Sequence, residues 1–236
     1  LKKIKQKLSA LNSSSGGGGN DLIWKPEPGK NVIRLLPYIH NRDWPFLELF
    51  FHYNISKKSF VSPTSFGEPD PIVEKAEQLK STGDKEDWKL ARKIEPKLRV
   101  HIPILVRGKE SEGVKFWGFS NQVYEELLKT MDDPDYGDIT DLKTGMDITV
   151  EYEPADTAAG QQWPSTTIRV KPKQTVATES TGVVEKIKSM PKAEDIWKAP
   201  SYVDIEDMFQ KFLNNSNDPE PTAPSITNTD GVQIPK

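Results

Sequence analysis

The sequence has 236 residues, of which 35% are hydrophobic and 28% charged, and its formal net charge is −3. No stretch approaches the roughly 18 apolar residues that a membrane span needs, and the basic start is not followed by an apolar run, so we expect neither a membrane association nor a secretory signal. Cysteine is absent, which excludes disulfide scaffolds, thiol nucleophiles and cysteine-ligated zinc. The length allows one domain with appendages or two small domains.

The N-terminal segment, residues 1–20, is basic and amphipathic. Its four positive charges, with no acid beside them, come from Lys2, Lys3, Lys5 and Lys7. Its apolar residues recur at the three- and four-residue spacing of one helix face, and they are Leu1, Ile4, Leu8 and Leu11. A Ser/Gly-rich linker follows, and a helix this short is marginal alone. We therefore predict a tethered basic arm that orders only on a partner.

The stretch from about residue 21 to 178 is predicted to be the folded body. Segments that alternate, or that are rich in β-branched and aromatic residues, predict strands at 31–37, 46–55, 98–107, 114–119, 146–153 and 165–171. Helical periodicity and capping residues predict helices at 71–81, 85–94 and 121–131. Strands outnumber helices, which favours a mainly β fold, a small β-barrel with helical insertions.

The last part, residues 179–236, differs in composition. One amphipathic helix is expected at 203–213. The tail beyond it contains four prolines, several Asn, Ser and Thr residues, and no aromatic residue. Such a tail cannot bury enough apolar surface to fold, so we predict that the chain is largely disordered after about residue 214.

Charge is segregated along the chain, although the total is close to neutral. The first twenty residues carry +4, whereas residues 194–236 hold eight acids against three lysines. Within the body, a basic stretch at 88–109 has seven cations and one acid, and apolar residues are interleaved with the cations. Cations beside flat aromatic faces are what single-stranded nucleic acid requires, because phosphates need positive charge and unstacked bases need stacking surfaces. The alternative is that these charged stretches are ordinary solvent-exposed surfaces without a binding role.

The common catalytic and cofactor signatures are missing. His40, His52 and His101 are the only histidines, and none belongs to an HExxH pattern. No P-loop, dinucleotide-binding or nucleophile-elbow motif occurs, and no convincing set of metal ligands is seen. We therefore expect no enzyme, no catalytic residues and no cofactor. A hydrolase that uses barrel-mouth carboxylates stays as a minor alternative, since such sites need no motif.

Short motifs in a fixed order point to a known family. They are LSALN at 8–12, WK at 24–25 followed by VIRLLP at 32–37, DWKLARK at 87–93, HIPILV at 101–106 and EGVKFWGFSNQVYEEL at 112–127. This arrangement resembles the single-stranded DNA-binding protein of T-even-type bacteriophages, also called helix-destabilising protein. The resemblance runs loosely over residues 2–178 and rests on the order and spacing of the motifs rather than on any one of them.

The resemblance implies an OB-fold barrel over about 21–178 with a small helical subdomain at about 56–95. It implies cooperative, sequence-independent binding and protection of single-stranded DNA in replication, recombination and repair, in the cytoplasm of an infected bacterial host. In such proteins the basic arm, here Lys2, Lys3, Lys5, Lys7 and Leu8, joins neighbouring subunits along the strand. The acidic segment, here 179–236, contacts other replication proteins. The alternative is an OB-fold protein-interaction module that does not bind nucleic acid.

The resemblance also implies DNA contacts by Arg34, Trp88, Lys89, Arg92, Lys93, Lys97, Arg99 and Trp117. Each has a structural alternative. A tryptophan in a β-barrel is more often part of the core than a stacking platform, and Arg34 could merely cap a barrel end. Strand alternation places Phe116 and Trp117 on opposite faces, so one of the two is expected to face outwards. Tyr53, Lys57 and Lys58 could line the cleft or be plain hairpin surface, and we favour the surface interpretation.

One departure from the family concerns zinc, which its members usually hold through one histidine and three cysteines. His52 stands at the matching place, but Ser62, Asp70 and Val73 stand where cysteines are expected. Valine has no donor atom and serine is a poor zinc ligand, so we predict that no zinc is bound. Apolar and proline packing is then expected to hold this loop, through Phe60, Pro63, Phe66, Pro69 and Ile72.

Overall fold

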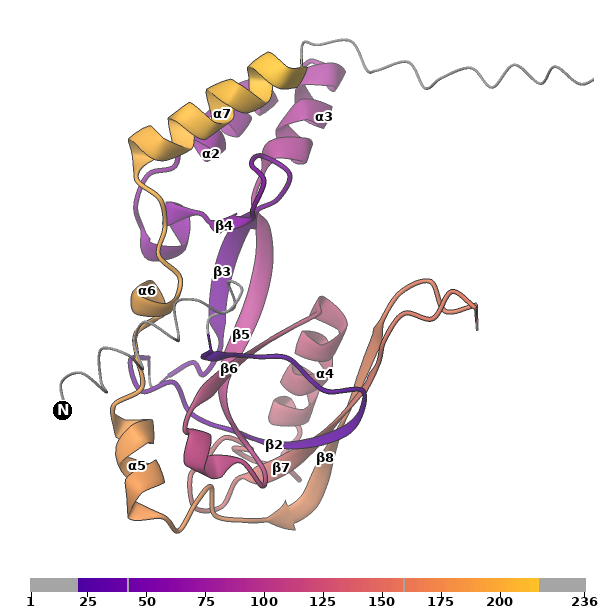
Figure 1. The fold of residues 1–236 in the computed structure, drawn as a ribbon, viewed down its shortest axis with the longest axis vertical. Coiled ribbons are helices and arrows are strands. Elements are labelled where there is room, and N and C mark those ends of the chain that lie inside the picture. Colours follow the sequence, from indigo (N-terminus) through magenta and orange to yellow (C-terminus); the bar gives the residue numbers. More distant parts are fainter. Residues whose placement is uncertain (1–20, 42, 159, 217–236) are drawn as a thin grey trace, which may run out of the picture.

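The computed structural model describes residues 21–41, 43–158 and 160–216 (Figure 1). The arm predicted for residues 1–20 and the tail beyond 216 therefore lie outside the described residues. No helix within the described ranges is long and apolar enough to cross a bilayer.

Eight strands of the described residues form one mixed sheet (Figure 1). Its main path runs in the order β1-β6-β5-β2-β7-β8, and β3 pairs with both β5 and β4 off this path. No pairing within the described residues joins β8 back to β1, so the sheet is open. The strands are β1 (Ile23–Trp24), β2 (Gly29–Leu35), β3 (Leu47–His52), β4 (Phe60–Val61), β5 (Lys97–Val106), β6 (Lys115–Phe119), β7 (Met146–Glu153) and β8 (Ser165–Gln174). The prediction of a mainly β fold with helical elements is confirmed.

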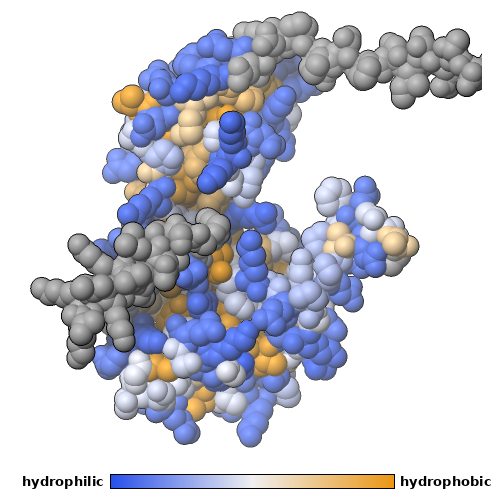
Figure 2. All heavy atoms as spheres, viewed as in Figure 1, coloured by the Kyte–Doolittle hydropathy of each residue, from blue (hydrophilic) through white to orange (hydrophobic). Residues whose placement is uncertain are grey.

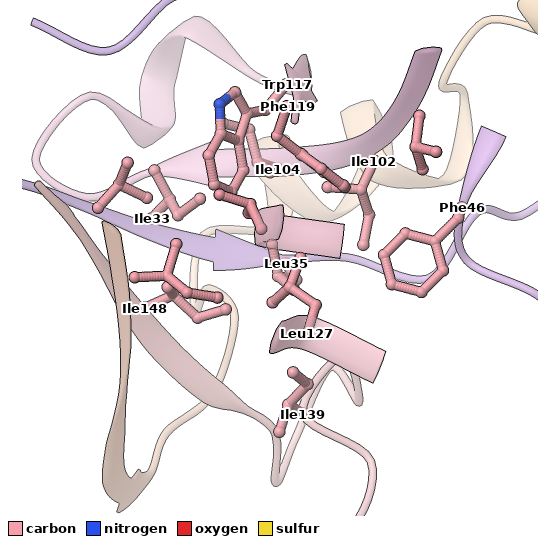
Figure 3. Packing of buried hydrophobic residues seen from close by; sticks show 14 of the residues in the cluster. Ile33, Leu35, Phe46, Ile102, Ile104, Trp117, Phe119, Leu127, Ile139 and Ile148 are labelled. Atoms are coloured by element: carbon pink, nitrogen blue, oxygen red, sulfur yellow. The ribbon is translucent and has the colours of Figure 1, made fainter. Parts of the chain in front are cut away.

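One face of the sheet buries the largest apolar cluster. The alternation of β2, β5 and β7 turns every second side chain towards this face, as the sequence predicts. Helix α4 (Asn121–Asp132) covers the face and contributes Val123 and Leu127. Figure 3 shows the packing of Ile33, Leu35, Phe46, Ile102, Ile104, Trp117, Phe119, Leu127, Ile139 and Ile148.

The opposite face of the sheet is covered by the chain that follows β8. Helices α5 (Thr181–Lys188) and α6 (Ala193–Ile196) join a second apolar cluster with Leu105 and Phe116. Trp197 extends this cover, since its ring centroid lies 5.7 Å from that of Phe116. The sheet thus lies between two covering layers, so the side chains on both faces of a strand can be buried.

Three helices form a separate layer at the top of Figure 1, which we call the helical layer. They are α2 (Pro71–Ser81), α3 (Lys85–Ile94) and α7 (Tyr202–Ser216), and they confirm the helices expected at 71–81, 85–94 and 203–213. Residues Ile205 and Phe209 of α7 share a buried cluster with α2 and α3 although they lie far away in sequence. Two short 3-10 turns, Pro63–Phe66 and Glu110–Glu112, complete the described elements.

Candidate nucleic-acid interface

A groove runs past the start of β5, the end of β6 and the start of α4 to the β7–β8 hairpin. Two adjoining hollows of about 570 and 440 Å³ share four wall residues, which are Arg99, Phe119, Ser120 and Gln122. The first hollow reaches Tyr53 and Lys97, and the second reaches Tyr152 and the start of β8. Figure 2 shows the molecule hollowed between the helical layer and the protruding β7–β8 hairpin, with mostly hydrophilic residues around the opening. We call this feature the groove.

The cations of the groove come from the first residues of β5. Lys97 and Arg99 are two positions apart, so both point to the same side of the strand, and both are exposed. Lys97 donates a hydrogen bond to the backbone oxygen of Arg92 at 3.0 Å, and Arg99 donates one from Nε to the Tyr53 hydroxyl at 3.1 Å. Neither takes part in a salt bridge with another described residue. Their charge is therefore available to an anion.

Helix α3 brings an aromatic ring and further cations to the end of the groove. The helix buries Ala91 and Ile94, so Trp88 and Arg92, four residues apart, share its outer face. Trp88 is 47% exposed, and the Arg92 guanidinium lies over its ring at 5.0 Å from the centroid. Lys93, in the last turn, is also exposed and has no salt-bridge partner within the described part of the chain. The hydrogen bond from Lys97 to the Arg92 backbone fixes α3 beside the cations of β5.

Lys89 is the exception among the predicted cations of this helix. Its ammonium group lies 2.8 Å from the Glu86 carboxylate one turn earlier, so its charge is partly neutralised. Both side chains remain largely exposed, and such a surface pair contributes little to stability. Lys89 is thus the weakest of the predicted contacts on α3.

Two predicted contact residues lie in the interior, and their predicted role is corrected here. Arg34 is fully buried; its guanidinium donates to the Thr175 hydroxyl at 3.0 Å and lies 3.8 Å from the Asp147 carboxylate. Burial lowers the pKa of Arg34, and the nearby carboxylates oppose this shift. Arg34 therefore holds β2 against β7 and the end of β8, and it has no surface to offer DNA.

Trp117 adjoins the wall of the groove, but only 1% of the residue is exposed, too little for a base to stack on it. Its ring packs edge-on against Trp24 at 5.8 Å. The expectation that Phe116 or Trp117 faces outwards is wrong, because Phe116 is also fully buried. The physical reason is the sandwich: α4 covers one side of β6, and α5 with α6 covers the other.

Two aromatic residues of this region were not among the predicted contacts. Trp163 is 74% exposed in the turn of the β7–β8 hairpin. Its position between two alternating segments, beside Pro164 and polar neighbours, is a signal that could have identified it as an exposed hairpin tip. Tyr53, which we interpreted as plain surface, lines the groove and is tied to Arg99.

The described residues contain no group of three or more His, Asp and Glu side chains placed to hold a metal ion. His52 and Asp70 are hydrogen-bonded to each other, with Nε2 at 3.0 Å from Oδ2. The groove itself is lined by hydroxyl, amide, aromatic and cationic groups. This chemistry suits the binding of phosphates and bases rather than a hydrolytic reaction.

A family model matches most of the chain. The family described as "gp32 DNA binding protein like" matches residues 27–213. None of the curated proteins compared with the chain matches it. The matched range includes the sheet from β2 onwards, the groove, and the helical layer up to the last turn of α7.

Proposed function

The chain belongs to the gp32-like DNA-binding protein family, and on this premise we propose that it binds single-stranded DNA along the groove without regard to base sequence. The observation that carries the proposal is the coincidence of unpaired cations and exposed aromatic rings on one path. Lys97 and Arg99 line the groove, and Trp88 with Arg92 stands at its end. Membership of a DNA-binding family also supports the interpretation of this chain as a binding protein rather than an enzyme.

The proposed contacts divide into two kinds. Arg92, Lys93, Lys97 and Arg99 would meet phosphates, and each phosphate neutralised adds about 0.7 to the slope of log affinity against log salt. Trp88 and Trp163 would stack on bases, at about 1–3 kcal/mol for each base. Duplex DNA hides its base faces inside the helix, so the same surface would select single strands. Arg34 and Trp117 are not part of this contact set.

We further propose that the sheet with α4 is an OB-type fold of about residues 21–178 and that residues 56–95 form its small subdomain. This proposal is supported by β2, which pairs with both β5 and β7, and by α4, which connects β6 to β7 across one face. Residues 179–236 would serve as a partner-binding segment.

The proposed setting is phage DNA replication, recombination and repair in the cytoplasm of the infected host. Cooperative binding through the basic arm would join neighbouring subunits, and the acidic segment would contact replication proteins. The charge of the arm, which lies outside the described part, and the acidic balance of residues 194–236, of which 217–236 lie outside it, support these roles by sequence alone.

Tryptophan fluorescence during titration with oligo-dT tests the proposal, with duplex DNA as the control ligand. We expect quenching by the single strand that weakens steeply as salt is raised. The double variant Lys97→Ala/Arg99→Ala should lose most of this binding. Lys188→Ala serves as the matched control, because Lys188 lies on α5 and is paired with Glu185 at 3.0 Å. Equal affinity for duplex and single strand, or equal loss in both variants, would contradict the proposal. Failure to bind either kind of DNA at low salt would contradict it in favour of an interaction module.

A further inference from the structure

Three polar side chains are buried together where β3, β4 and the start of α2 meet. His52, Ser62 and Asp70 are each at most 1% exposed. The Asp70 carboxylate is the centre: it accepts from the Ser62 hydroxyl and from the imidazole Nε2 of His52, the latter at 3.0 Å. Its other oxygen accepts from the backbone N–H of Ile72 at 2.9 Å and so caps α2. We call these three side chains the His52 network.

The second nitrogen of His52 extends the network to α3. Its Nδ1 lies 3.2 Å from the backbone oxygen of Ile94, the last residue of that helix. Both ring nitrogens thus face oxygens that can only accept, so the ring satisfies both when each nitrogen carries a proton. In that arrangement the ring donates to Asp70 and to the Ile94 carbonyl, and the remaining acceptor sites of the carboxylate are filled.

The Asp70 side chain fits this ionic pairing. Burial raises the pKa of Asp70, but the hydrogen bonds from His52 and Ser62 and the charge of His52 outweigh it, so the pKa lies below its usual value. Removing one partner of such a pair leaves an uncompensated buried charge, which is strongly destabilising. The network therefore joins four segments of the chain at one point: β3, the turn after β4, α2 and α3.

These positions are the ones where the resemblance implies zinc, and the donor set does not fit a metal. Val73 has no donor atom, the Ser62 hydroxyl gives its hydrogen to Asp70, and both nitrogens of His52 are engaged. The predicted packing of apolar residues and prolines is therefore only part of what holds this loop in place. Pro63 and Ile72 are buried, but Pro69 is exposed. The buried polar side chains Ser62 and Asp70 adjoin Pro63 and Ile72.

We propose that the His52 network is a metal-independent tie that fixes α3, and with it Trp88 and Arg92, at the end of the groove. His52 and Asp70 are positioning residues in this role, because neither reaches the surface. The part of the proposal that concerns DNA rests on the proposed function.

The full-length chain provides a matched pair of substitutions for the test. Asp70 and Asp84 both cap a helix of the same layer through two backbone N–H groups, but Asp84 is exposed and contacts no histidine. Asp70→Asn should lower the melting temperature and speed amide hydrogen exchange in α3 well beyond Asp84→Asn. Equal effects would reduce Asp70 to a helix cap and overturn the tie. Ser62→Ala, which removes one hydrogen bond, is the milder variant if Asp70→Asn does not fold.

Two further measurements address the metal and the proton. A chelator, or added zinc, should leave the melting temperature of the unsubstituted chain unchanged, and a fall with the chelator would overturn metal independence. Nitrogen-15 NMR of labelled histidine should show one ring with two slowly exchanging N–H groups, and that signal should be lost in Asp70→Asn. A single ring proton on His52 would contradict the ionic pair.

The DNA arm of the test separates the tie from the proposed function. In Asp70→Asn, faster amide hydrogen exchange in α3 should be accompanied by an at least severalfold weaker affinity for oligo-dT. Loosened α3 with unchanged affinity would overturn the positioning role. Failure of the unsubstituted chain to bind oligo-dT would overturn the proposed function instead, while the exchange and chelator results would still decide the tie.

Discussion

The sheet body and the helical layer are held together in different ways. Among the described residues, the main cluster of the sheet body contains fifteen buried apolar side chains, whereas the cluster of the helical layer contains seven. The smaller cluster is supplemented by the buried His52–Asp70 pair and by α7, which returns from the far end of the chain to cover α2. The sheet body also holds a buried polar contact, Arg34 with Asp147, but a small apolar core depends more on such contacts than a large one does.

This difference bears on where a ligand can be recognised. The covered parts of the sheet are sandwiched between helices, so Arg34 and Trp117, which lie there, serve structure. The helical layer is thin, and its outer face leaves Trp88 and Arg92 exposed. The proposed contacts therefore lie on exposed parts of the molecule: α3, the start of β5 and the β7–β8 hairpin.

The largest expected effect is the loss of core packing in Trp117→Ala. Removal of a buried tryptophan costs about 3–5 kcal/mol of unfolding free energy. Trp88→Ala, on the exposed face of α3, should change the same quantity by no more than about 0.5 kcal/mol. Urea unfolding of both variants measures the difference, and comparable losses would show that Trp88 is as structural as Trp117.

Phe209→Ala should weaken the helical layer alone. Phe209 is 5% exposed in α7, and its truncation should cost about 3 kcal/mol. Native-state hydrogen exchange should show faster exchange in α2, α3 and α7 and little change in β2 and β5. Uniform loss of protection in both regions would mean that they unfold as one unit.

His101 lies on the border and should add an acid-sensitive contribution. Its ring packs at a tilt against Trp197, with ring centroids 4.6 Å apart, and burial lowers its pKa from 6.5 to about 4. The unfolded chain then binds the proton more readily, so stability is lost as the pH falls from about 6.5 to about 4, by about 3 kcal/mol at most. Chemical unfolding across this range should show a shallower loss in His101→Leu. Identical slopes would contradict the lowered pKa.

Trp88→Ala should weaken binding of oligo-dT by about 1–3 kcal/mol through the loss of one stacked base. Trp44→Ala is the matched control, because Trp44 is 38% exposed but is hydrogen-bonded to Glu48 and has no cation over its ring, unlike Trp88. Fluorescence anisotropy of a labelled oligonucleotide measures both. If the control lost as much affinity as Trp88→Ala, the groove would not be the binding surface.

The smallest expected effect is on salt dependence. Arg99→Ala should lower the slope of log affinity against log salt by about 0.7, the share of one phosphate. Arg34→Lys should leave that slope unchanged in the folded protein, since Arg34 is buried. Titrations at several salt concentrations decide this, and a reduced slope for Arg34→Lys alone would reverse the assignment of the two arginines.

Local patterns predicted most of the elements, because the strands and α4 have clear alternation or helical periodicity. The burial of Arg34 and Trp117 could not be predicted, since alternation does not reveal whether one face of a sheet is covered or both. The contact of α7 with α2 and the meeting of His52, Ser62 and Asp70 depend on the tertiary fold and leave no periodic signal. The exposure of Trp163 could have been predicted, because a tryptophan in a polar connection between two strands is expected to be exposed.

Backbone amide NMR with and without oligo-dT is the most direct test of where DNA binds. We predict changes at the end of α3, the start of β5, the start of α4 and the β7–β8 hairpin. A separate hollow outside the groove, lined by Trp24, Lys30 and Lys109, provides an internal comparison for these amide signals. Changes centred on that hollow, with the amides around Lys97 and Arg99 unmoved, would contradict binding in the groove.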